Sequence, residues 1–269
     1  MTSALLDGKT VLVTGAGGRI GREIVAVLSR EGAAVAATDL TAESAESGAQ
    51  RAAGRACAIA GDVSEQVDVA RVVSFAEDQL GPLTGLVNAH GIYPNTAVTE
   101  VEVDEWDRVF AVNTRGTMLT CRALARLWTE RSAGGCIVNL SSGAANSVRR
   151  GGAHYSGSKA AVNSLTFALA MELGRLGIRV NSVEPGLILD EVFYADSGAS
   201  TYQQEHARAY VEDAVNAIPL GRSGQPSDVA ETIAFLLSDR SCWTTGTVIS
   251  IDGGSGAGRT HLPFSPGIK

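Results

Sequence analysis

Short apolar segments, rich in Val, Ile and Ala, alternate along the chain with longer segments that have the length of helices. The apolar segments read as strands at residues 10–14, 33–39, 56–62, 85–89, 136–141, 178–183 and 247–251. Helix-length segments between them include residues 20–30, 65–80, 102–128 and 155–176. Such alternation is typical of right-handed βαβ crossovers. The pattern therefore predicts an α/β fold with a Rossmann-type, doubly wound, seven-stranded parallel sheet flanked by helices on both faces.

Two segments depart from this alternation. Residues 187–218 form an insertion before the last predicted helix, and residues 253–269 form a tail rich in Gly, Ser and Pro. Because no linker-like segment separates the predicted strands, we expect residues 1–269 to form a single domain. We expect the insertion to cover the substrate as a lid, with its later apolar positions packing rather than touching substrate.

Composition narrows the functional classes. The chain has 269 residues, 45% of them hydrophobic, which is enough to bury a large core. Its net charge of −7 argues against binding to nucleic acid or to anionic membranes. The chain has no run of 18 apolar residues, and its first residues are polar, so we expect no membrane span and no signal peptide. Four dispersed cysteines without a CxxC pair or a metal-spaced His cluster predict reduced thiols, no metal site and a cytoplasmic location.

A glycine-rich turn joins the first predicted strand to its helix, running from Thr14 to Gly21. Glycines there let the backbone approach a pyrophosphate at the helix N-terminus, although a merely flexible turn has the same composition. Asp39 ends the second predicted strand, where a carboxylate can bind the adenosine ribose hydroxyls and repel a 2′-phosphate. Asp39 could instead cap the following helix. The two features together favour NAD over NADP.

Tyr155 and Lys159 are four residues apart on a predicted helix and therefore lie on one face of it. A phenol titrates near pH ~10, and an ammonium group beside it favours the phenolate. The pair is therefore a candidate for proton transfer. A surface tyrosine beside a solvated lysine is the alternative.

These motifs, in this order, resemble the short-chain dehydrogenase/reductase family over about residues 9–254. Thr14, Gly15 and Gly21 match the family's glycine motif, but Arg19 stands in place of its middle glycine. The remaining matches are Asp62-Val63, Asn88-Ala89-His90-Gly91, Asn113, Ser142 placed 13 residues before Tyr155, Lys159, Pro185-Gly186 and Asp252-Gly253-Gly254.

The resemblance implies four catalytic residues. Tyr155 would exchange a proton with the substrate oxygen while hydride moves to or from a nicotinamide. Lys159 would lower the tyrosine pKa and hold the nicotinamide ribose. Ser142 would donate a hydrogen bond to the substrate oxygen, and Asn113 would hold a water that links Lys159 to solvent. Ser141 is the rival of Ser142, and the spacing to Tyr155 favours Ser142.

The resemblance also implies a set of cofactor contacts. The expected residues are Gly15, Gly17, Arg19, Ile20, Asp39, Asp62, Val63, Asn88, Ala89, Gly91, Tyr155, Lys159, Pro185, Gly186 and Ile188. Ile188 is expected to hold the carboxamide through its backbone, because Asp190 replaces the threonine that the family often has there. Arg19 weakens the expectation of NAD, since basic residues near this turn accompany NADP in parts of the family.

Substrate contacts are expected from two places. Phe193 and Tyr194 lie in the insertion, and Arg149 and Arg150 lie between Ser142 and the catalytic tyrosine. The two arginines could bind a carboxylate, phosphate or sulfonate, with solvated loop arginines as the alternative.

Two histidines flank these motifs without matching them. His154 precedes the catalytic tyrosine, but adjacent helix residues point to different sides, so we expect it to be structural or at the rim. His90 is expected to line the cofactor cleft rather than to take part in the chemistry.

We therefore predict an NAD-dependent oxidoreductase that interconverts a secondary alcohol and a ketone. The alternatives are an NADPH-dependent 3-oxoacyl-thioester or carbonyl reductase and a non-catalytic nucleotide-binding protein on the same fold. The resemblance also implies a homotetramer or homodimer with the helix of Tyr155 at one interface.

Overall fold

The computed structural model describes residues 4–189 and 211–258, and within them a seven-stranded parallel sheet has the order β3-β2-β1-β4-β5-β6-β7. The strands are β1 (Thr10–Thr14), β2 (Ala34–Asp39), β3 (Ala56–Ala60), β4 (Gly85–Asn88), β5 (Gly135–Leu140), β6 (Ile178–Pro185) and β7 (Val248–Ile251). The predicted strands and the predicted fold class are confirmed.

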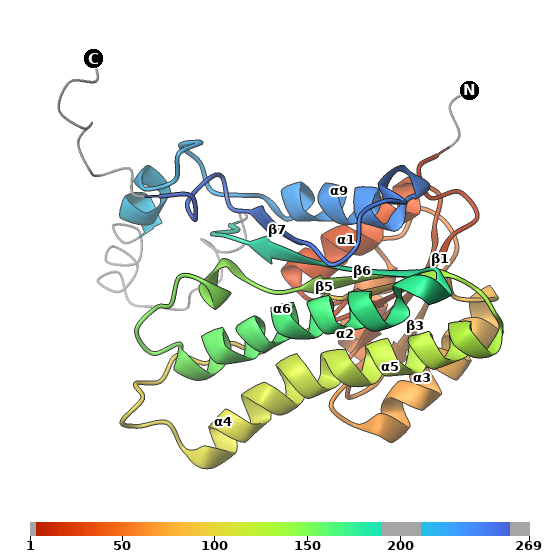
Figure 1. Cartoon of the computed structure of the whole chain (residues 1–269), viewed down its shortest axis with the longest axis horizontal. Coiled ribbons are helices and arrows are strands. Elements are labelled where there is room, and N and C mark those ends of the chain that lie inside the picture. Colours follow the sequence, from red (N-terminus) through yellow and green to blue (C-terminus); the bar gives the residue numbers. More distant parts are fainter. Residues whose placement is uncertain (1–3, 190–210, 259–269) are drawn as a thin grey trace.

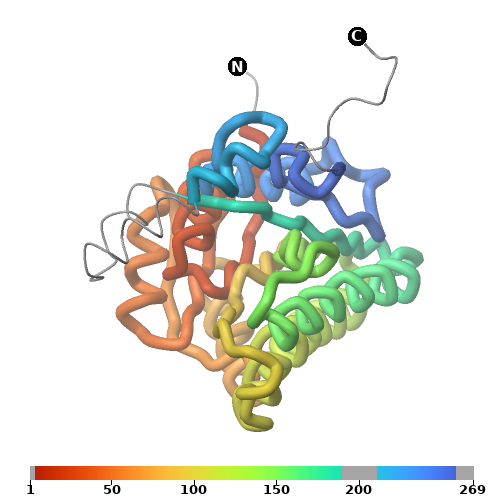
Figure 2. Tube along the Cα trace, turned by 90° about the vertical axis from the view of Figure 1, so that its left-hand side faces the viewer, coloured from red at the N-terminus to blue at the C-terminus, as the bar shows by residue number. Residues whose placement is uncertain are grey.

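Helices cover both faces of this sheet (Figure 1). The α-helices are α1 (Arg19–Arg30), α2 (Ala42–Ala49), α3 (Gln66–Leu80), α4 (Val103–Phe110), α5 (Thr117–Glu130), α6 (Ala153–Leu173) and α9 (Pro226–Leu237). Helices α1 and α9 pack together on one face, and α3, α5 and α6 cover the other (Figures 1 and 2). Short 3-10 turns lie at η2 (Gly143–Ala145), η3 (Gly174–Leu176) and η4 (Asp239–Ser241).

The central strand β1 shows why the strands are apolar throughout. Val11 and Val13 belong to the core cluster under α1 and α9, whereas Leu12 belongs to the cluster under α3 and α5. Successive side chains of a strand point to opposite faces, and both faces are covered here. All five residues of β1 are consequently buried.

The predicted helix at residues 102–128 is wrong in one respect, because the structure divides it. Helix α4 is followed by a π-helical turn, η1 (Ala111–Gly116), and then by α5. Helix α2 is the helix that follows Asp39, and Thr41 caps it by accepting a hydrogen bond from the backbone N–H of Ser44. Single-turn π-helices occur mostly inside α-helices and frequently at functional sites. The divided helix therefore marks a position to examine for chemistry.

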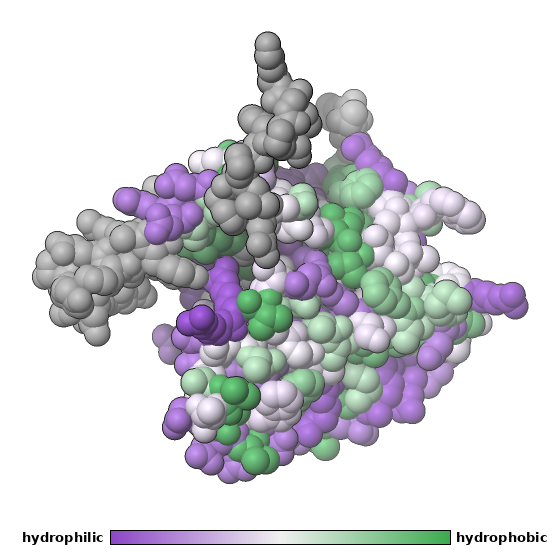
Figure 3. All heavy atoms as spheres, turned by 60° about the vertical axis from the view of Figure 1, so that its left-hand side comes forward, coloured by the Kyte–Doolittle hydropathy of each residue, from purple (hydrophilic) through white to green (hydrophobic). Residues whose placement is uncertain are grey.

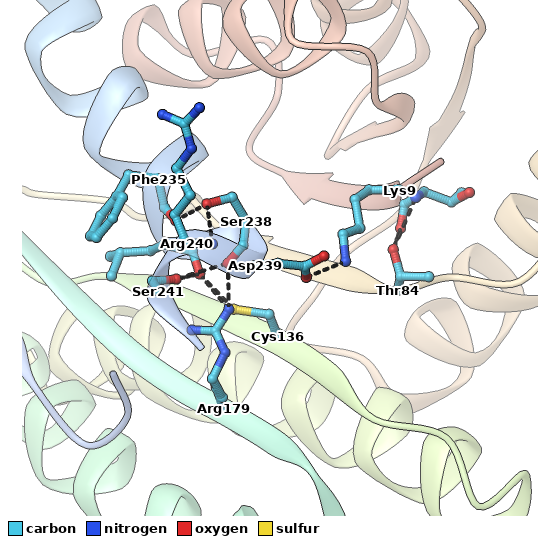
Figure 4. Close-up of polar contacts among 11 residues, drawn as sticks. Lys9, Thr84, Cys136, Arg179, Phe235, Ser238, Asp239, Arg240 and Ser241 are labelled. Carbon is cyan, nitrogen blue, oxygen red and sulfur yellow. Dashed lines mark hydrogen bonds and ion pairs between the residues drawn. The ribbon is translucent and has the colours of Figure 1, made fainter. Parts of the chain in front are cut away.

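Polar contacts join the amino ends of the strands to the segment at the end of α9 (Figure 4). Arg179 at the start of β6 donates to the carbonyl oxygens of Leu236 at 2.8 Å and Ser238 at 3.2 Å, which lie at the C-terminal end of α9. Lys9, just before β1, forms an ion pair with Asp239 at 2.8 Å. Structural contacts thus occupy the amino ends of the strands. A ligand site is therefore expected at the carboxyl ends of the strands, on the opposite side of the sheet.

The predicted lid lies largely outside the described residues, as do Phe193 and Tyr194 within it. On its described sides, the backbone of Gly224 pairs with Leu187 and Leu189 through hydrogen bonds of 2.9 and 3.0 Å. Val211 and Ile218, two positions of the predicted packing stripe, are buried. Within residues 4–189 and 211–258, none of the helices combines the length and the apolar character that a membrane span requires.

Candidate active site

The site residues gather at the carboxyl ends of the strands, where β1 and β4 lie side by side and the strand order changes direction. Such a switch point leaves a crevice between loops that diverge to opposite faces of the sheet, the usual ligand site of this architecture. Figure 2 looks onto this edge, and Figure 3 shows it with polar and apolar side chains interspersed.

The glycine-rich turn after β1 has the geometry of a phosphate-binding turn. Gly15 has a φ of +65°, and a Cβ there would lie 2.6 Å from the Cα of His90. Only glycine therefore fits where this turn passes the end of β4. Arg19 is the first residue of α1 and has no positive φ, so the missing middle glycine causes no backbone strain. The N-terminus of α1 is left pointing into the crevice.

Asp39 lies beside this turn rather than at the cap of α2. Its carboxylate accepts hydrogen bonds from the backbone N–H of Gly17 at 2.9 Å and of Leu40 at 2.7 Å. Thr41 caps α2 instead, so the capping alternative for Asp39 is excluded. The negative charge is thereby held at the end of β2, next to the glycine turn.

Arg19 connects the two sides of the crevice. Its guanidinium donates to the carbonyl oxygen of Ile188 at 3.4 Å, and Ile188 directly follows the turn at the end of β6. Gly186 in that turn packs against Asp252, where a Cβ would lie 2.7 Å from the Asp252 Cβ. The structure therefore brings the predicted glycine turn, the Pro-Gly turn and the segment after β7 together.

The Asn88 side chain forms its hydrogen bonds inside the protein, between the sheet and the helices that cover it. Its amide donates to Asn139 Oδ1 at 2.9 Å and accepts from Thr120 at 2.8 Å, and Asn139 in turn donates to Thr166 at 3.0 Å. The Asn88 side chain is 1% exposed. It links β4, β5, α5 and α6 and is not presented to the crevice.

The remaining predicted cofactor residues surround the same edge. Ile20 and Ala89 pack at the border of the core cluster under α1. Val63 lies against η1, since a Cβ on Gly116 would be 3.0 Å from its side chain. The Asp62 carboxylate accepts hydrogen bonds from the backbone N–H and the hydroxyl of Ser64, at 2.8 and 2.7 Å.

Three of the predicted catalytic residues meet at the start of α6. Tyr155 and Lys159 lie on this helix, with the lysine nitrogen 6.0 Å from the tyrosine ring centre. Ser142, directly before η2, has its side chain close enough to the Tyr155 hydroxyl to lower the pKa of that group. Its rival Ser141 is buried and donates to the Lys159 carbonyl at 3.0 Å. The arrangement favours Ser142 as the residue facing the reacting oxygen.

Burial dominates the electrostatics of this pair. It raises the pKa of Tyr155, and the hydrogen bond with Ser142 only partly offsets that increase. Burial also lowers the pKa of Lys159 to about 8, and its ammonium group donates to the Leu140 carbonyl at 2.8 Å. Desolvation of the phenol thus outweighs the groups that lower its pKa, and the lowering of the tyrosine pKa by Lys159 stays a prediction.

Asn113 lies in the π-helical turn and is fully buried. Its amide donates to the carbonyl of Ile92 and accepts from the N–H of Ile92, both at 2.9 Å. A Cβ on Gly91 would lie 3.3 Å from Asn113 Oδ1 and 3.3 Å from Lys159 Nζ. Glycine at position 91 therefore allows the Asn113 oxygen and the lysine nitrogen to approach the same point.

The two histidines are structural. His154 has no exposed surface, and its Nε2 lies 3.0 Å from Glu105 of α4. His90 lies between Thr14 and Thr117, at 2.6 and 3.3 Å. Burial, and secondly the charge of Lys159, lower the pKa of His90 to about 3, so it stays neutral near neutral pH.

Sequence reasoning missed two residues of the site. Tyr93, 73% exposed in the loop after β4, contacts the Tyr155 ring edge-on at a centroid distance of 6.2 Å. The sequence feature that could have indicated Tyr93 is its position shortly after β4, one of the two strands at the switch point. Glu184 is a buried carboxylate, and an ionisable residue at the end of a predicted strand, directly before Pro185-Gly186, was the signal there.

The two predicted substrate arginines are exposed, as the solvated alternative requires. The charge of Arg149 nevertheless acts to lower the pKa of Tyr155, against the larger effect of burial. Among the described residues, no group of three or more His, Cys, Asp or Glu side chains is arranged to hold a metal ion.

Comparison with known proteins gives concordant matches. Residues 15–256 match the family model described as enoyl-(acyl carrier protein) reductase. The chain is 38% identical to a (3R)-3-hydroxyacyl-CoA dehydrogenase of Mus musculus, over 93% of this chain and 96% of that protein. It is 34% identical to a sorbitol dehydrogenase of Cereibacter sphaeroides, over 93% and 98%. The crystal structure of levodione reductase superposes with a TM-score of 0.85 at 28% identity, covering 93% and 98% of the two chains.

Proposed function

The chain belongs to the short-chain dehydrogenase/reductase family and is an NAD(P)-dependent oxidoreductase of alcohol and carbonyl groups; we propose that it uses NAD to interconvert a secondary alcohol and a ketone. The observation that carries this proposal is the meeting of Ser142, Tyr155 and Lys159 beside the glycine turn and Asp39.

The residues around the crevice suit a dinucleotide. Gly15, Gly17 and the N-terminus of α1 would hold the pyrophosphate, and Asp39 would bind the adenosine ribose. Lys159 would hold the nicotinamide ribose near Gly91, where its ammonium nitrogen lies. The nicotinamide, when bound, supplies the hydride acceptor or donor.

The chain's own groups move and hold the proton. Tyr155 takes the proton from the alcohol hydroxyl, or returns it to the ketone oxygen, through its phenolic oxygen. Ser142 orients that oxygen by a hydrogen bond and stabilises the negative charge that develops on it. Lys159 places a positive charge within 6.0 Å of the tyrosine ring, and Asn113, beside it at Gly91, is suited to hold a water for proton exchange.

Arg149 supports a preference for substrates that carry a negative charge. Arg149 is exposed, and its positive charge acts to lower the pKa of Tyr155. A carboxylate, phosphate or sulfonate on the substrate would therefore have a positively charged partner near the reacting carbon. Arg150 is its neighbour in the same loop and serves as the internal comparison.

A panel of secondary alcohols that differ in size and charge tests these proposals together. We expect NAD reduction with some of them, and a higher kcat/KM for anionic members than for neutral ones of equal size. Arg149→Gln should reduce that advantage by about tenfold, the value of one charge-assisted contact, whereas Arg150→Gln should change it less. Activity only as reduction of 3-oxoacyl thioesters with NADPH would contradict the proposal.

We also propose that α6 lies at an interface between copies of the chain in the cytoplasm, where its free cysteines would stay reduced. Two large apolar side chains on this helix are exposed, Phe167 by 47% and Met171 by 85%. Light scattering should give the mass of a dimer or tetramer for the native chain. The Phe167→Glu, Met171→Glu variant should give a smaller species, and an unchanged mass would contradict the role of α6.

A further inference from the structure

Glu184 lies at the end of β6 and is 2% exposed, although it carries an ionisable side chain. Its Oε1 accepts hydrogen bonds from the amide nitrogens of Asn163 at 2.6 Å and Asn146 at 2.9 Å. Its Oε2 accepts from the same Asn146 nitrogen at 2.9 Å and from the Ser250 hydroxyl at 3.5 Å. Both oxygens therefore face donors only.

The donors cannot reverse their direction without loss. A carboxylate only accepts hydrogen bonds, so the amide nitrogen of Asn163 has to face Glu184, while the Asn163 side-chain oxygen lies 3.3 Å from the Ser182 hydroxyl on its other side. Among the described residues no cation forms an ion pair with Glu184. A buried carboxylate held by neutral donors costs desolvation energy that apolar packing would not. The hydrogen bonds of Glu184 therefore point to a role in holding the geometry of the segments it joins.

The three hydrogen-bonded segments are those that carry the proposed chemistry. Asn146 ends the η2 turn that begins after Ser142. Asn163 lies one helical turn beyond Lys159 on α6, and Glu184 itself directly precedes the Pro185-Gly186 turn. The η2 turn also lies close to that turn, since a Cβ on Gly143 would be 3.6 Å from the Pro185 carbonyl oxygen.

We propose that Glu184 is a positioning residue of the active site, whose carboxylate ties the loop of Ser142 to the helix of Tyr155 and Lys159 and to the Pro-Gly turn. The proposal rests on the function proposed above. Its consequence is that Glu184 sets the position of the Ser142 hydroxyl relative to the Tyr155 hydroxyl without touching substrate.

Two isosteric single substitutions test the hydrogen bond with Asn146. Glu184→Gln turns an N–H donor toward the Asn146 amide, and Asn146→Asp sets two carboxylates against each other. Each should lower kcat by roughly 10- to 100-fold, because a displacement of about 1 Å can cost that much. NADH affinity should change much less than kcat, since the glycine turn and the Asp39 side of the crevice are untouched and only the Pro185-Gly186 turn next to Glu184 can shift. Glu172→Gln on the exposed side of α6 is the matched control and should leave kcat unchanged.

Combining the two substitutions reverses the polarity of the contact. The glutamine introduced by Glu184→Gln can keep its oxygen toward Asn163 while its N–H donates to the aspartate introduced by Asn146→Asp. The Glu184→Gln, Asn146→Asp variant should therefore recover kcat to within about fivefold of the native value, a strong positive coupling. If the fold-losses in kcat of the two single variants simply multiply in the double variant, the proposal is overturned. Recovery of kcat in the double variant would show that the single variants did not lose activity by unfolding.

Hydrogen exchange gives a readout that does not depend on turnover. The backbone N–H groups of Ala145, Asn146 and Ser147 donate to Ser142 and Gly143 carbonyls at 2.9, 3.2 and 2.9 Å. Their exchange should become faster in each single variant and return toward the native rate in the double variant. Unchanged exchange and unchanged kcat in Glu184→Gln would refute the positioning role while leaving the proposed function intact. Full turnover in Tyr155→Phe would instead refute the proposed function.

Discussion

Tyr155→Phe should lower kcat for alcohol oxidation by about 100- to 10,000-fold, the usual contribution of a positioned general acid/base. The substitution removes only the hydroxyl that Ser142 hydrogen-bonds. Phenylalanine keeps the ring, its volume and its edge contact with Tyr93 at 6.2 Å. NADH affinity should therefore change by less than about twofold, which fluorescence titration measures beside steady-state kinetics.

The pH dependence provides a second readout for the same residue. Burial raises the pKa of Tyr155, and alcohol oxidation needs its deprotonated form. The rate of oxidation by the native chain should consequently rise with pH across the alkaline range, and ketone reduction should show the opposite trend. The residual activity of Tyr155→Phe should lose this dependence. A variant with the native profile would show that another group transfers the proton.

Asp39→Asn should shift the ratio of kcat/KM for NAD over NADP toward NADP by about 100-fold, because placing two like charges together costs several kcal/mol. Asparagine keeps an oxygen that can accept from the Gly17 N–H, now at 2.9 Å, so the turn itself is preserved. The expected gain is in the use of NADP, through relief of the repulsion of its 2′-phosphate. Steady-state kinetics with both cofactors measures the ratio.

Arg19→Gln serves as the control for this shift. The Arg19 guanidinium already donates to the Ile188 carbonyl at 3.4 Å, so its loss should weaken the binding of both cofactors to a similar degree. A native chain that prefers NADP, or an Asp39→Asn variant with the native ratio, would show that Asp39 does not select the cofactor.

Local patterns were enough to predict the strands, the order of strands and helices, and the catalytic candidates. Periodicity and spacing are properties of contiguous residues, so the four-residue separation of Tyr155 and Lys159 is readable before any folding. The division of the helix at residues 102–128 was not readable in this way. The hydrogen bonds of Asn113 with Ile92 in the next loop accompany the π-helical turn, and that contact spans 21 residues.

The sequence by itself thus determined the fold class, because periodicity depends on residue type and local spacing. It also predicted the glycine turn and, through the family resemblance, the Ser142, Tyr155 and Lys159 set. Only the tertiary structure decided how those groups behave. Desolvation raises the pKa of Tyr155, and Thr41 caps α2, so that the Asp39 carboxylate binds the glycine turn instead. The hydrogen bonds of the buried Glu184 carboxylate join residues as far apart as Asn146 and Ser250. Burial and hydrogen-bond partners are set by packing between distant segments, which no local pattern records.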